Sequence, residues 1–322
     1  MSQSALFDRI AIVGIGLIGS SLARALRAEG LAGHVACFDA DPAARATAAD
    51  LGFLDSVHDT LADAVAGADL VVLAVPPGAI ATVGADLAPL LAAGTIVTDV
   101  ASTKRSVIDA LVPLLPDGVA LVPGHPIAGT EHSGPAAGFA ELFRGRFCIL
   151  TPPPGTNRAA IDKVAEIWRR IGSDVEIMDA NHHDRVLAVT SQLPHLIAYT
   201  NVATAADLED QLGAAPKSDD VVTTAEVIRY SASGFRDFTR IAASDPVMWR
   251  DVFLNNKDAV LEMLGRFTED LTALQRAIRW GDGDELERVF RRTRDIRRGV
   301  IEAGQAGRFI YTENGETEES ED

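Results

Sequence analysis

His125 lies in the stretch VPGHPIAGTEHSG (residues 122–134), where proline and glycine restrict the backbone around the imidazole. An enzyme that oxidises an alcohol needs a base for the hydroxyl proton, and histidine is neutral near pH 7 and can accept it. His125 ends a predicted strand, and the carboxyl ends of strands in an open parallel sheet line the ligand crevice. Ser102 and Lys104 follow the neighbouring predicted strand. His125 is therefore a candidate base, although it could instead bond carbonyls of its own turn.

A second chemical signal is the glycine-rich run Gly14-Ile15-Gly16-Leu17-Ile18-Gly19, which follows the first predicted strand and opens the first predicted helix. Such glycines allow a tight turn, close approach of the backbone to a pyrophosphate, and close packing of helix on strand. Asp39 follows about 20 residues later, where a carboxylate binds ribose hydroxyls and would repel a 2′-phosphate. With Val75 and Pro76, these residues predict NAD as the cofactor. The alternatives are a glycine turn of another doubly wound fold and an ordinary cap at Asp39.

The elements that must position these residues alternate in the first half of the chain. Apolar runs predict strands at 9–16, 34–39, 69–77, 94–102, 119–126 and 146–154, and helical spacing predicts a helix over 17–30. Asp41-Pro42 predicts the start of another helix. Runs that are apolar on both faces indicate parallel strands covered on both sides. We expect an α/β, Rossmann-like dinucleotide-binding domain with a doubly wound sheet over residues 1–178.

From about residue 179 the pattern becomes helical. We predict long helices over 179–208, 244–280 and 281–304, the second capped by Ser244 or Asp245. Pro194 cannot donate to the carbonyl of Thr190, so a local opening is expected in the first of these helices. The expected organisation is an all-helical domain over 179–308 and a solvated acidic tail over 309–322.

Bulk composition excludes several classes of function. The chain has 322 residues, 47% of them hydrophobic, and a formal net charge of −17. This charge disfavours duplex nucleic acid and anionic membrane surfaces as partners. The two cysteines, Cys37 and Cys148, lie in apolar runs, which is typical of a reducing compartment. Since the sequence shows neither a signal peptide nor a membrane span, we expect a cytoplasmic protein. His132, His182 and His183 are interpreted as surface or capping residues, and their spacing does not suggest a metal site.

Five motifs give a more specific indication. The strings VGIGLIGSSLARAL, DVASTK, GHPIAGTEHSG, SQLPHLIA and GFRDFTRIAASDPVMWRD together resemble the prephenate dehydrogenase (TyrA) family of tyrosine biosynthesis. The matches occur in the family's order and span roughly residues 9–300. The resemblance implies oxidation of prephenate, arogenate or both with loss of carbon dioxide, giving 4-hydroxyphenylpyruvate or tyrosine. It also implies a homodimer formed through the helical domain.

The resemblance assigns roles to individual residues. It implies that His125 activates the substrate hydroxyl, that Ser102 assists it by hydrogen bonding, and that His195 contacts the substrate. It implies that Arg240 binds a substrate carboxylate. Arg236, four residues earlier on the same predicted helical face, adds a second guanidinium for an acidic substrate. The alternative for Arg240 is an ordinary surface arginine on a soluble helix. The alternative for His195 is a core histidine.

Further positions complete the expected substrate site. Glu131 resembles a family glutamate near the mouth of the site, and Trp249 matches a tryptophan near the substrate side chain, with core or dimer packing as its alternative. Gln192 departs from the family pattern, in which many members have histidine. Because an amide does not titrate near neutral pH, any pH-dependent role at this position is in doubt.

Two other functions fit parts of the sequence. One is a different two-domain Rossmann oxidoreductase of the β-hydroxyacid dehydrogenase type, for which Lys257 would be the candidate catalytic lysine. The other is a non-catalytic NAD-binding regulator, which would need the glycine loop and Asp39 but neither His125 nor Arg240. The joint presence of both residues in intact motifs favours the enzyme.

Overall fold

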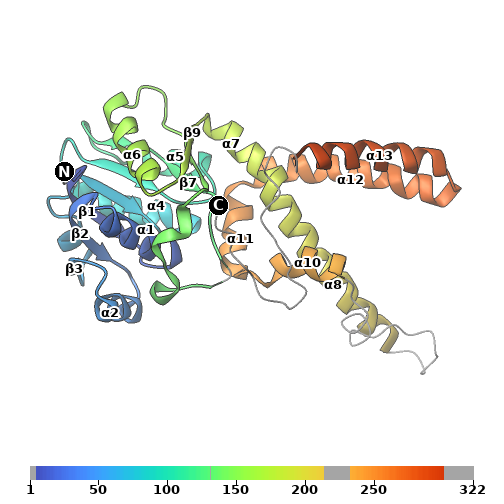
Figure 1. Ribbon diagram of the computed structural model, residues 1–322, viewed down its shortest axis with the longest axis horizontal. Coiled ribbons are helices and arrows are strands. Elements are labelled where there is room, and N and C mark those ends of the chain that lie inside the picture. Colours follow the sequence, from blue (N-terminus) through green and yellow to red (C-terminus); the bar gives the residue numbers. More distant parts are fainter. Residues whose placement is uncertain (1–4, 131, 214–232, 301–322) are drawn as a thin grey trace. The chain divides into compact units, whose positions relative to one another are not determined.

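The computed structural model describes residues 5–130, 132–213 and 233–300. Its first part contains a six-stranded parallel sheet with the order β3-β2-β1-β4-β5-β6 (Figure 1). The strands are β1 (Phe7–Val13), β2 (Ala32–Phe38), β3 (Ser56–Val57), β4 (Leu70–Leu73), β5 (Ile96–Asp99) and β6 (Ala120–Leu121). This order, reversing between β1 and β4, is that of doubly wound dinucleotide-binding folds. The predicted fold class is confirmed.

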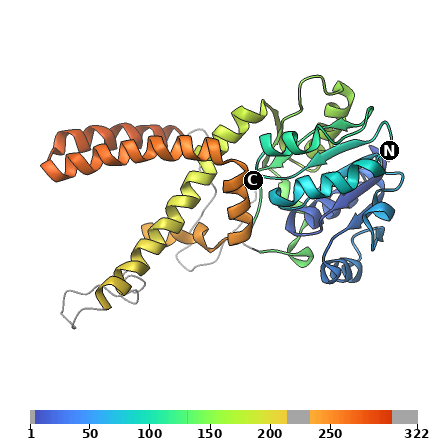
Figure 2. The ribbon, with the colours of Figure 1, turned by 180° about the vertical axis from the view of Figure 1, so that it is seen from behind.

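Alternate residues of the central strands enter two separate cores. Ile10 and Ile12 of β1 belong to one core, which includes Trp168, whereas Ala11 and Val13 belong to the other. Helices α1 (Leu17–Ala28) and α6 (Arg158–Arg170) contribute to the first core, and α3 (Leu61–Val65), α4 (Ile80–Leu87) and α5 (Arg105–Leu111) to the second. Figure 2 shows the layers from behind. The central residues of β1, β2 and β4 are apolar on both faces because helices cover both sides of the sheet there. Asp41 caps α2 (Pro42–Leu51), as predicted, by accepting the N–H of Ala43 at 2.9 Å.

The run 119–126 continues the parallel series only through Ala120–Leu121, and the run 146–154 does not join that sheet, so the prediction for these two runs is confirmed for β6 and wrong for the rest. Strand β6 ends at Leu121, and Pro123 has no N–H with which to extend a ladder. The chain instead forms β7 (Gly124–Pro126), which pairs antiparallel with β8 (Phe147–Leu150) in a second sheet. Strand β9 (Asp174–Ile177) completes that sheet in parallel with β8. The sequence pattern missed β9 because most of its side chains are exposed.

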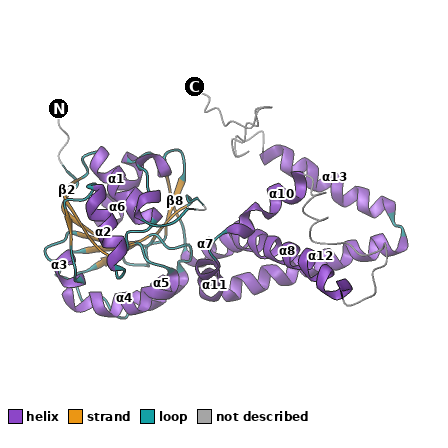
Figure 3. Ribbon diagram, turned by 90° about the horizontal axis from the view of Figure 1, so that it is seen from below, coloured by secondary structure: helices purple, strands orange, loops and turns teal. Residues whose placement is uncertain are grey.

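After β9 the described residues are helical (Figure 3). Helix α7 (Ala180–Leu187) passes through a π-helical turn at Ala188–Gln192 into α8 (Leu193–Gly213). The opening expected near Pro194 is thereby confirmed. The predicted helix over 244–280 is two helices, α11 (Pro246–Asn255) and α12 (Lys257–Trp280). They are separated by Asn256, which leaves helical geometry with φ −127° and ψ 30°.

The remaining helical elements lie before α11 and after α12. Helix α10 (Ser233–Thr239) is followed by a 3₁₀ turn over Arg240–Ala243, and Asp245 caps α11 by accepting the N–H of Met248 at 2.8 Å. Helix α13 (Gly283–Val300) follows α12 after a turn in which Gly281 has φ 68°. None of the helices within the described residues combines the length and apolarity that a membrane crossing requires.

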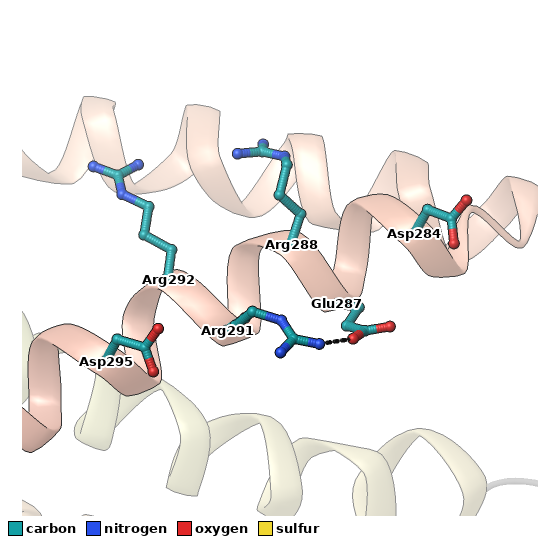
Figure 4. Close-up of a pocket in the computed structure, with 6 residues that line it drawn as sticks. All are labelled: Asp284, Glu287, Arg288, Arg291, Arg292 and Asp295. Carbon is teal, nitrogen blue, oxygen red and sulfur yellow. Dashed lines mark hydrogen bonds and ion pairs between the residues drawn. The ribbon is translucent and has the colours of Figure 1, made fainter.

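The chain divides into two compact units, Met1–Met263 and Leu264–Asp322. The first unit contains both sheets and all the predicted site residues that the structure describes. In the second, α13 carries exposed arginines paired with acids about one turn earlier, including Arg288 with Glu285. Figure 4 shows another such pair, Arg291 with Glu287. Such pairs support an exposed helix. The predicted division at residues 178 and 179 stays a prediction, and the expected acidic tail lies outside the described residues.

Candidate active site

The loop between β1 and α1 uses each glycine differently. Gly14 has φ 95°, and a Cβ there would lie 2.4 Å from the carbonyl oxygen of Ala74 in the neighbouring chain segment. A Cβ at Gly19 would lie 2.1 Å from the carbonyl oxygen of Gly14, so only glycine allows α1 to pack this closely on the loop. A Cβ at Gly16 would meet no atom within 4 Å, and no side chain caps α1 there. The open backbone at this helix N-terminus fits a pyrophosphate.

Asp39 is held against the same loop at the end of β2. One carboxylate oxygen accepts the backbone N–H of Ile15 at 2.8 Å, and the other accepts that of Asp41 at 2.9 Å. Each oxygen has a further lone pair for a ribose hydroxyl. Val75 lies beside Gly14, since its Cγ1 would be 3.0 Å from a Cβ at that glycine, and Pro76 follows as an exposed residue. The open backbone of the loop and the carboxylate of Asp39 therefore fit a dinucleotide whose ribose has a free 2′-hydroxyl.

His125 is buried in β7, with only 7% of its surface exposed, and it pairs with Ile149 of β8. Its Nδ1 lies 2.8 Å from Nε2 of His183 on α7. Among the described side chains the hydrogen-bond partner of His125 is thus a second histidine. Ser102 is half-buried and makes no side-chain hydrogen bond to His125 within the same residues. Its assisting role stays a prediction.

The prediction that His183 is a surface or capping residue is wrong. His183 is fully buried, and its Nδ1 lies 2.7 Å from Oδ1 of Asp184. The two carboxylate oxygens of Asp184 also accept the backbone N–H groups of Lys104 and Arg105, at 2.8 and 2.9 Å. Asp184 therefore fixes α7 to the start of α5. His132 and His182 are exposed, as expected.

A sequence signal for this buried pair did exist. The buried positions of α7 are Ala180, His183, Asp184 and Leu187, which follow the i, i+3, i+4, i+7 spacing of one helical face. Two polar residues therefore occupy the stripe that should face the core. Buried polar groups need partners, so this placement indicates a specific hydrogen-bonded role.

Lys104 lies beneath β7. Its side chain is fully buried, and its Nζ contacts the carboxylate of Asp99 and donates to the carbonyl oxygen of Gly124 at 2.6 Å. Burial lowers the pKa of Lys104, and the adjacent Asp99 opposes that shift. Asp99 also accepts the backbone N–H of Gly124 at 3.3 Å. This pair links the end of β5 to the strand that carries His125.

His195 and Trp249, both predicted to contact substrate, lie together. Their rings stack with centroids 3.6 Å apart and 24° between their planes. The Nδ1 of His195 lies 2.8 Å from the carbonyl oxygen of Ser191, so it carries the proton and leaves Nε2 as an acceptor. The indole N–H of Trp249 is buried and has no partner among the described residues. On this assignment, Nε2 of His195 is the acceptor that the pair offers a substrate.

The predicted arginines lie on the adjoining segment. Arg236 is exposed on α10, and Arg240 is exposed at the start of the following 3₁₀ turn, so the predicted single helical face ends at Thr239. Burial is the main cause that lowers the pKa of His195; the bond to the backbone of Ser191 opposes this shift, and the charge of Arg240 adds a smaller lowering. Glu131 lies outside the described residues.

Gln192, at the end of the π-helical turn, is buried. Its Oε1 accepts Nδ2 of Asn256 at 2.8 Å, and the same Nδ2 donates to the backbone carbonyl oxygen of Asp184 at 2.9 Å. One asparagine between α11 and α12 thus joins the π-helical turn to α7. The break between α11 and α12 thus carries the side chain that makes both bonds.

The buried imidazole of His125 predicts acid sensitivity. Burial, with smaller contributions from His183 and Lys104, lowers its pKa well below the ordinary value of 6.5. The unfolded chain then binds a proton that the folded chain excludes, so stability is full above pH 6.5 and falls as the pH is lowered. We expect His125→Asn to lose less unfolding free energy than wild type between pH 7.5 and pH 5.5 in urea titrations. Equal losses in the two proteins would contradict a neutral buried His125.

Comparison with known proteins identifies relatives that align with most of the chain. The family "Prephenate dehydrogenase, nucleotide-binding domain" matches residues 22–177, and "Prephenate dehydrogenase, dimerization domain" matches residues 179–292. The cyclohexadienyl dehydrogenase of Zymomonas mobilis is 43% identical over 90% of this chain and 95% of its own. The prephenate dehydrogenase of Bacillus subtilis is 32% identical over 91% of this chain and 76% of its own.

Solved structures agree with these matches. The prephenate dehydrogenase of A. aeolicus, in complex with hydroxyphenyl propionate and NAD⁺, has a TM-score of 0.81 and 32% identity, covering 91% of this chain and 98% of its own. The arogenate dehydrogenase of Synechocystis has a TM-score of 0.76 and 25% identity, covering 91% of this chain and 99% of its own.

Proposed function

The chain belongs to the prephenate dehydrogenase family, and on this premise we propose that it converts prephenate to 4-hydroxyphenylpyruvate, arogenate to tyrosine, or both. The reaction is an NAD-dependent oxidative decarboxylation in tyrosine biosynthesis. The observation that carries the proposal is a buried imidazole, His125, with one ring nitrogen bonded to His183. Its other nitrogen is available for a substrate hydroxyl.

Each of the site residues has its own role in the proposed reaction. The glycine loop and Asp39 would hold NAD, which would supply the acceptor for the hydride that leaves the ring carbon bearing the hydroxyl. His125 takes the hydroxyl proton as the carbonyl forms, and loss of the ring carboxylate as carbon dioxide makes the ring aromatic. Arg240 binds a carboxylate through its planar guanidinium, and the stacked His195 and Trp249 contact the substrate beside it. The open loop at Gly16 and the carboxylate of Asp39 hold the cofactor.

The two alternative functions are not favoured. Both curated relatives named above are dehydrogenases that align with at least 90% of this chain, so a non-catalytic regulator is not favoured. The β-hydroxyacid dehydrogenase alternative relied on Lys257, which is exposed at the start of α12. The proposed reaction instead uses His125 and His195, which the structure places apart from Lys257 in β7 and α8.

Direct turnover tests the proposal. Purified protein is mixed with NAD and either prephenate or arogenate, and NADH absorbance is followed for both substrates side by side. We expect NADH formation with at least one of them, together with 4-hydroxyphenylpyruvate or tyrosine as the product. Absence of NADH with both substrates, from protein that binds NAD, would exclude the proposed reaction.

Asp39 predicts the choice of cofactor. Because its carboxylate is fixed by two backbone N–H groups, it cannot swing away from a 2′-phosphate. We expect kcat/KM to be at least about 10-fold higher with NAD than with NADP, which corresponds to roughly 1.4 kcal/mol. Asp39→Asn removes the negative charge and should bring the kcat/KM values for NAD and NADP closer together. Equal kcat/KM values for the two cofactors in wild type would show that Asp39 does not select between them.

Assembly and location follow from less direct observations. We propose a homodimer through the helical region, because the second unit exposes large apolar side chains and residues 179–292 match a dimerization domain. The exposed apolar side chains are Leu271, Ile278, Trp280, Phe290 and Ile296. Light scattering would measure the assembly. Cys37 and Cys148 are buried and unpaired, which supports a reducing compartment such as the cytoplasm.

A further inference from the structure

We propose that His183 and Asp184 are positioning residues that hold His125 as its Nδ1–H tautomer and take over the positive charge when Nε2 of His125 accepts the substrate proton. The inference deepens the proposed function and rests on it for the proton transfer. It concerns the chain Asp184–His183–His125, in which each neighbouring pair is joined by one hydrogen bond.

Hydrogen-bond directions can be assigned along this chain. Asp184 already accepts the backbone N–H groups of Lys104 and Arg105, and an ionised carboxylate can only accept. The hydrogen between Asp184 and His183 therefore belongs to Nδ1 of His183. A neutral His183 then has a bare Nε2, which must receive its hydrogen from Nδ1 of His125. His125 is left with a bare Nε2, which is the form that a general base requires.

Burial supports the neutral state of both rings. It is the largest cause of the lowered pKa of His183, which Asp184 partly opposes. The pKa of His125 is lowered more strongly, and no carboxylate opposes that shift. Between the two rings, His183 is therefore the better place for a positive charge.

The proton balance of the step is simple. The substrate hydroxyl gives its proton to Nε2 of His125, and the Nδ1 proton of His125 moves to Nε2 of His183. His125 ends neutral, and His183 becomes an imidazolium whose Nδ1–H still donates to the carboxylate of Asp184. The starting state is restored when Nε2 of His183 returns its proton to Nδ1 of His125 and Nε2 of His125 releases its proton to water.

The groups around the chain explain why the charge should move. Lys104 and its partner Asp99 lie below β7, and the Cys148 thiol on β8 is close to both of them. Burial and Lys104 act against a charged His125, whereas Asp184 lies 2.7 Å from His183. Transfer to His183 thus converts an unpaired buried cation into an ion pair. The side-chain amide of Asn256 also donates a hydrogen bond to the backbone carbonyl oxygen of Asp184.

The first test is kinetic. In His183→Leu the Nδ1–H of His125 loses its acceptor, and loss of the correct tautomer in a related three-residue arrangement of a different enzyme costs about 10⁴-fold. We expect kcat to fall by about 10²–10⁴-fold with KM for the substrate and NAD binding nearly unchanged. His182→Leu, an exposed neighbour on the same helix, is the matched control and should retain wild-type kcat. In His183→Gln the amide oxygen can still accept a hydrogen bond from His125 but cannot take up a proton. Its kcat should therefore lie between those of His183→Leu and wild type.

The second test needs no substrate, which separates this inference from the proposed function. In ¹⁵N-histidine NMR of wild type at pH 7.5, His125, assigned with His125→Asn, should show protonated Nδ1 and bare Nε2. A bare Nδ1 would overturn the inference even if the enzyme turns over prephenate. Wild-type kcat in folded His183→Leu would overturn it as well. If His183→Leu does not fold, His183→Gln and the wild-type spectrum still decide.

Discussion

Replacing His125 with asparagine is expected to lower kcat by about 10²–10⁴-fold, the range for loss of a general base, while KM changes little. Asparagine keeps a polar group in a buried position of β7 but cannot accept a proton near neutral pH. KM should be nearly unchanged because the substrate carboxylate is assigned to Arg240, not to His125. Initial rates of NADH formation over a range of substrate concentrations give both constants.

His132→Asn is the matched control for this variant. His132 belongs to the same glycine-rich stretch, but its side chain is exposed. It should retain wild-type kcat. Fluorescence titration with NADH checks that the cofactor site of His125→Asn is intact. A His125→Asn protein that binds NADH and turns over at a near-normal rate would remove His125 from the mechanism.

The cofactor half of the site was predictable because its chemistry depends on the backbone. Gly14 needs a positive φ, and Gly19 tolerates no Cβ, so residue type alone identifies the loop. Asp39 is identified by its place at the end of β2. The contacts of Gly19 with Gly14 and of Asp39 with Ile15 act within about 25 residues of sequence. Local patterns of this kind are the most reliable part of a prediction from one sequence.

The partner of His125 was not predictable in the same way. His183 lies 58 residues away, and it meets His125 only because the chain leaves the first sheet at Pro123 and forms β7. An isolated histidine pair carries no spacing signal. The helical stripe of α7 indicates that His183 and Asp184 are buried, but it does not indicate what they face. Such long-range polar contacts need the tertiary structure.

The contacts of Gln192 also could not be predicted from the sequence. The departure from the family's usual histidine was visible in the sequence and put in doubt a pH-dependent role at this position. In the structure, Gln192 is buried and bonded to Asn256, which also holds the backbone of Asp184. The substitution therefore bears on how α7 and the start of α12 are joined. Its consequence for the substrate would be indirect, through the residues that support His125.

The substrate carboxylate leads to the second large expected effect. Arg240→Gln should raise KM for prephenate or arogenate by about 10–100-fold, because a hydrogen bond to a charged group contributes about 1.5–3 kcal/mol. The change in kcat should be smaller, since Arg240 binds the substrate before and during the reaction. The pKa of His195 should rise in this variant, because the positive charge of Arg240 contributes to lowering it.

Two further variants sharpen the interpretation. Arg240→Lys keeps the charge but loses the planar pair of N–H donors, so its KM should lie between those of wild type and Arg240→Gln. Arg158→Gln is the control, because Arg158 is an exposed arginine on α6 whose partner is Asp162 at 2.9 Å. An unchanged KM in Arg240→Gln would mean that another cation holds the carboxylate. Arg236 would then be the first to test, because it lies on the adjoining helix α10 and is exposed.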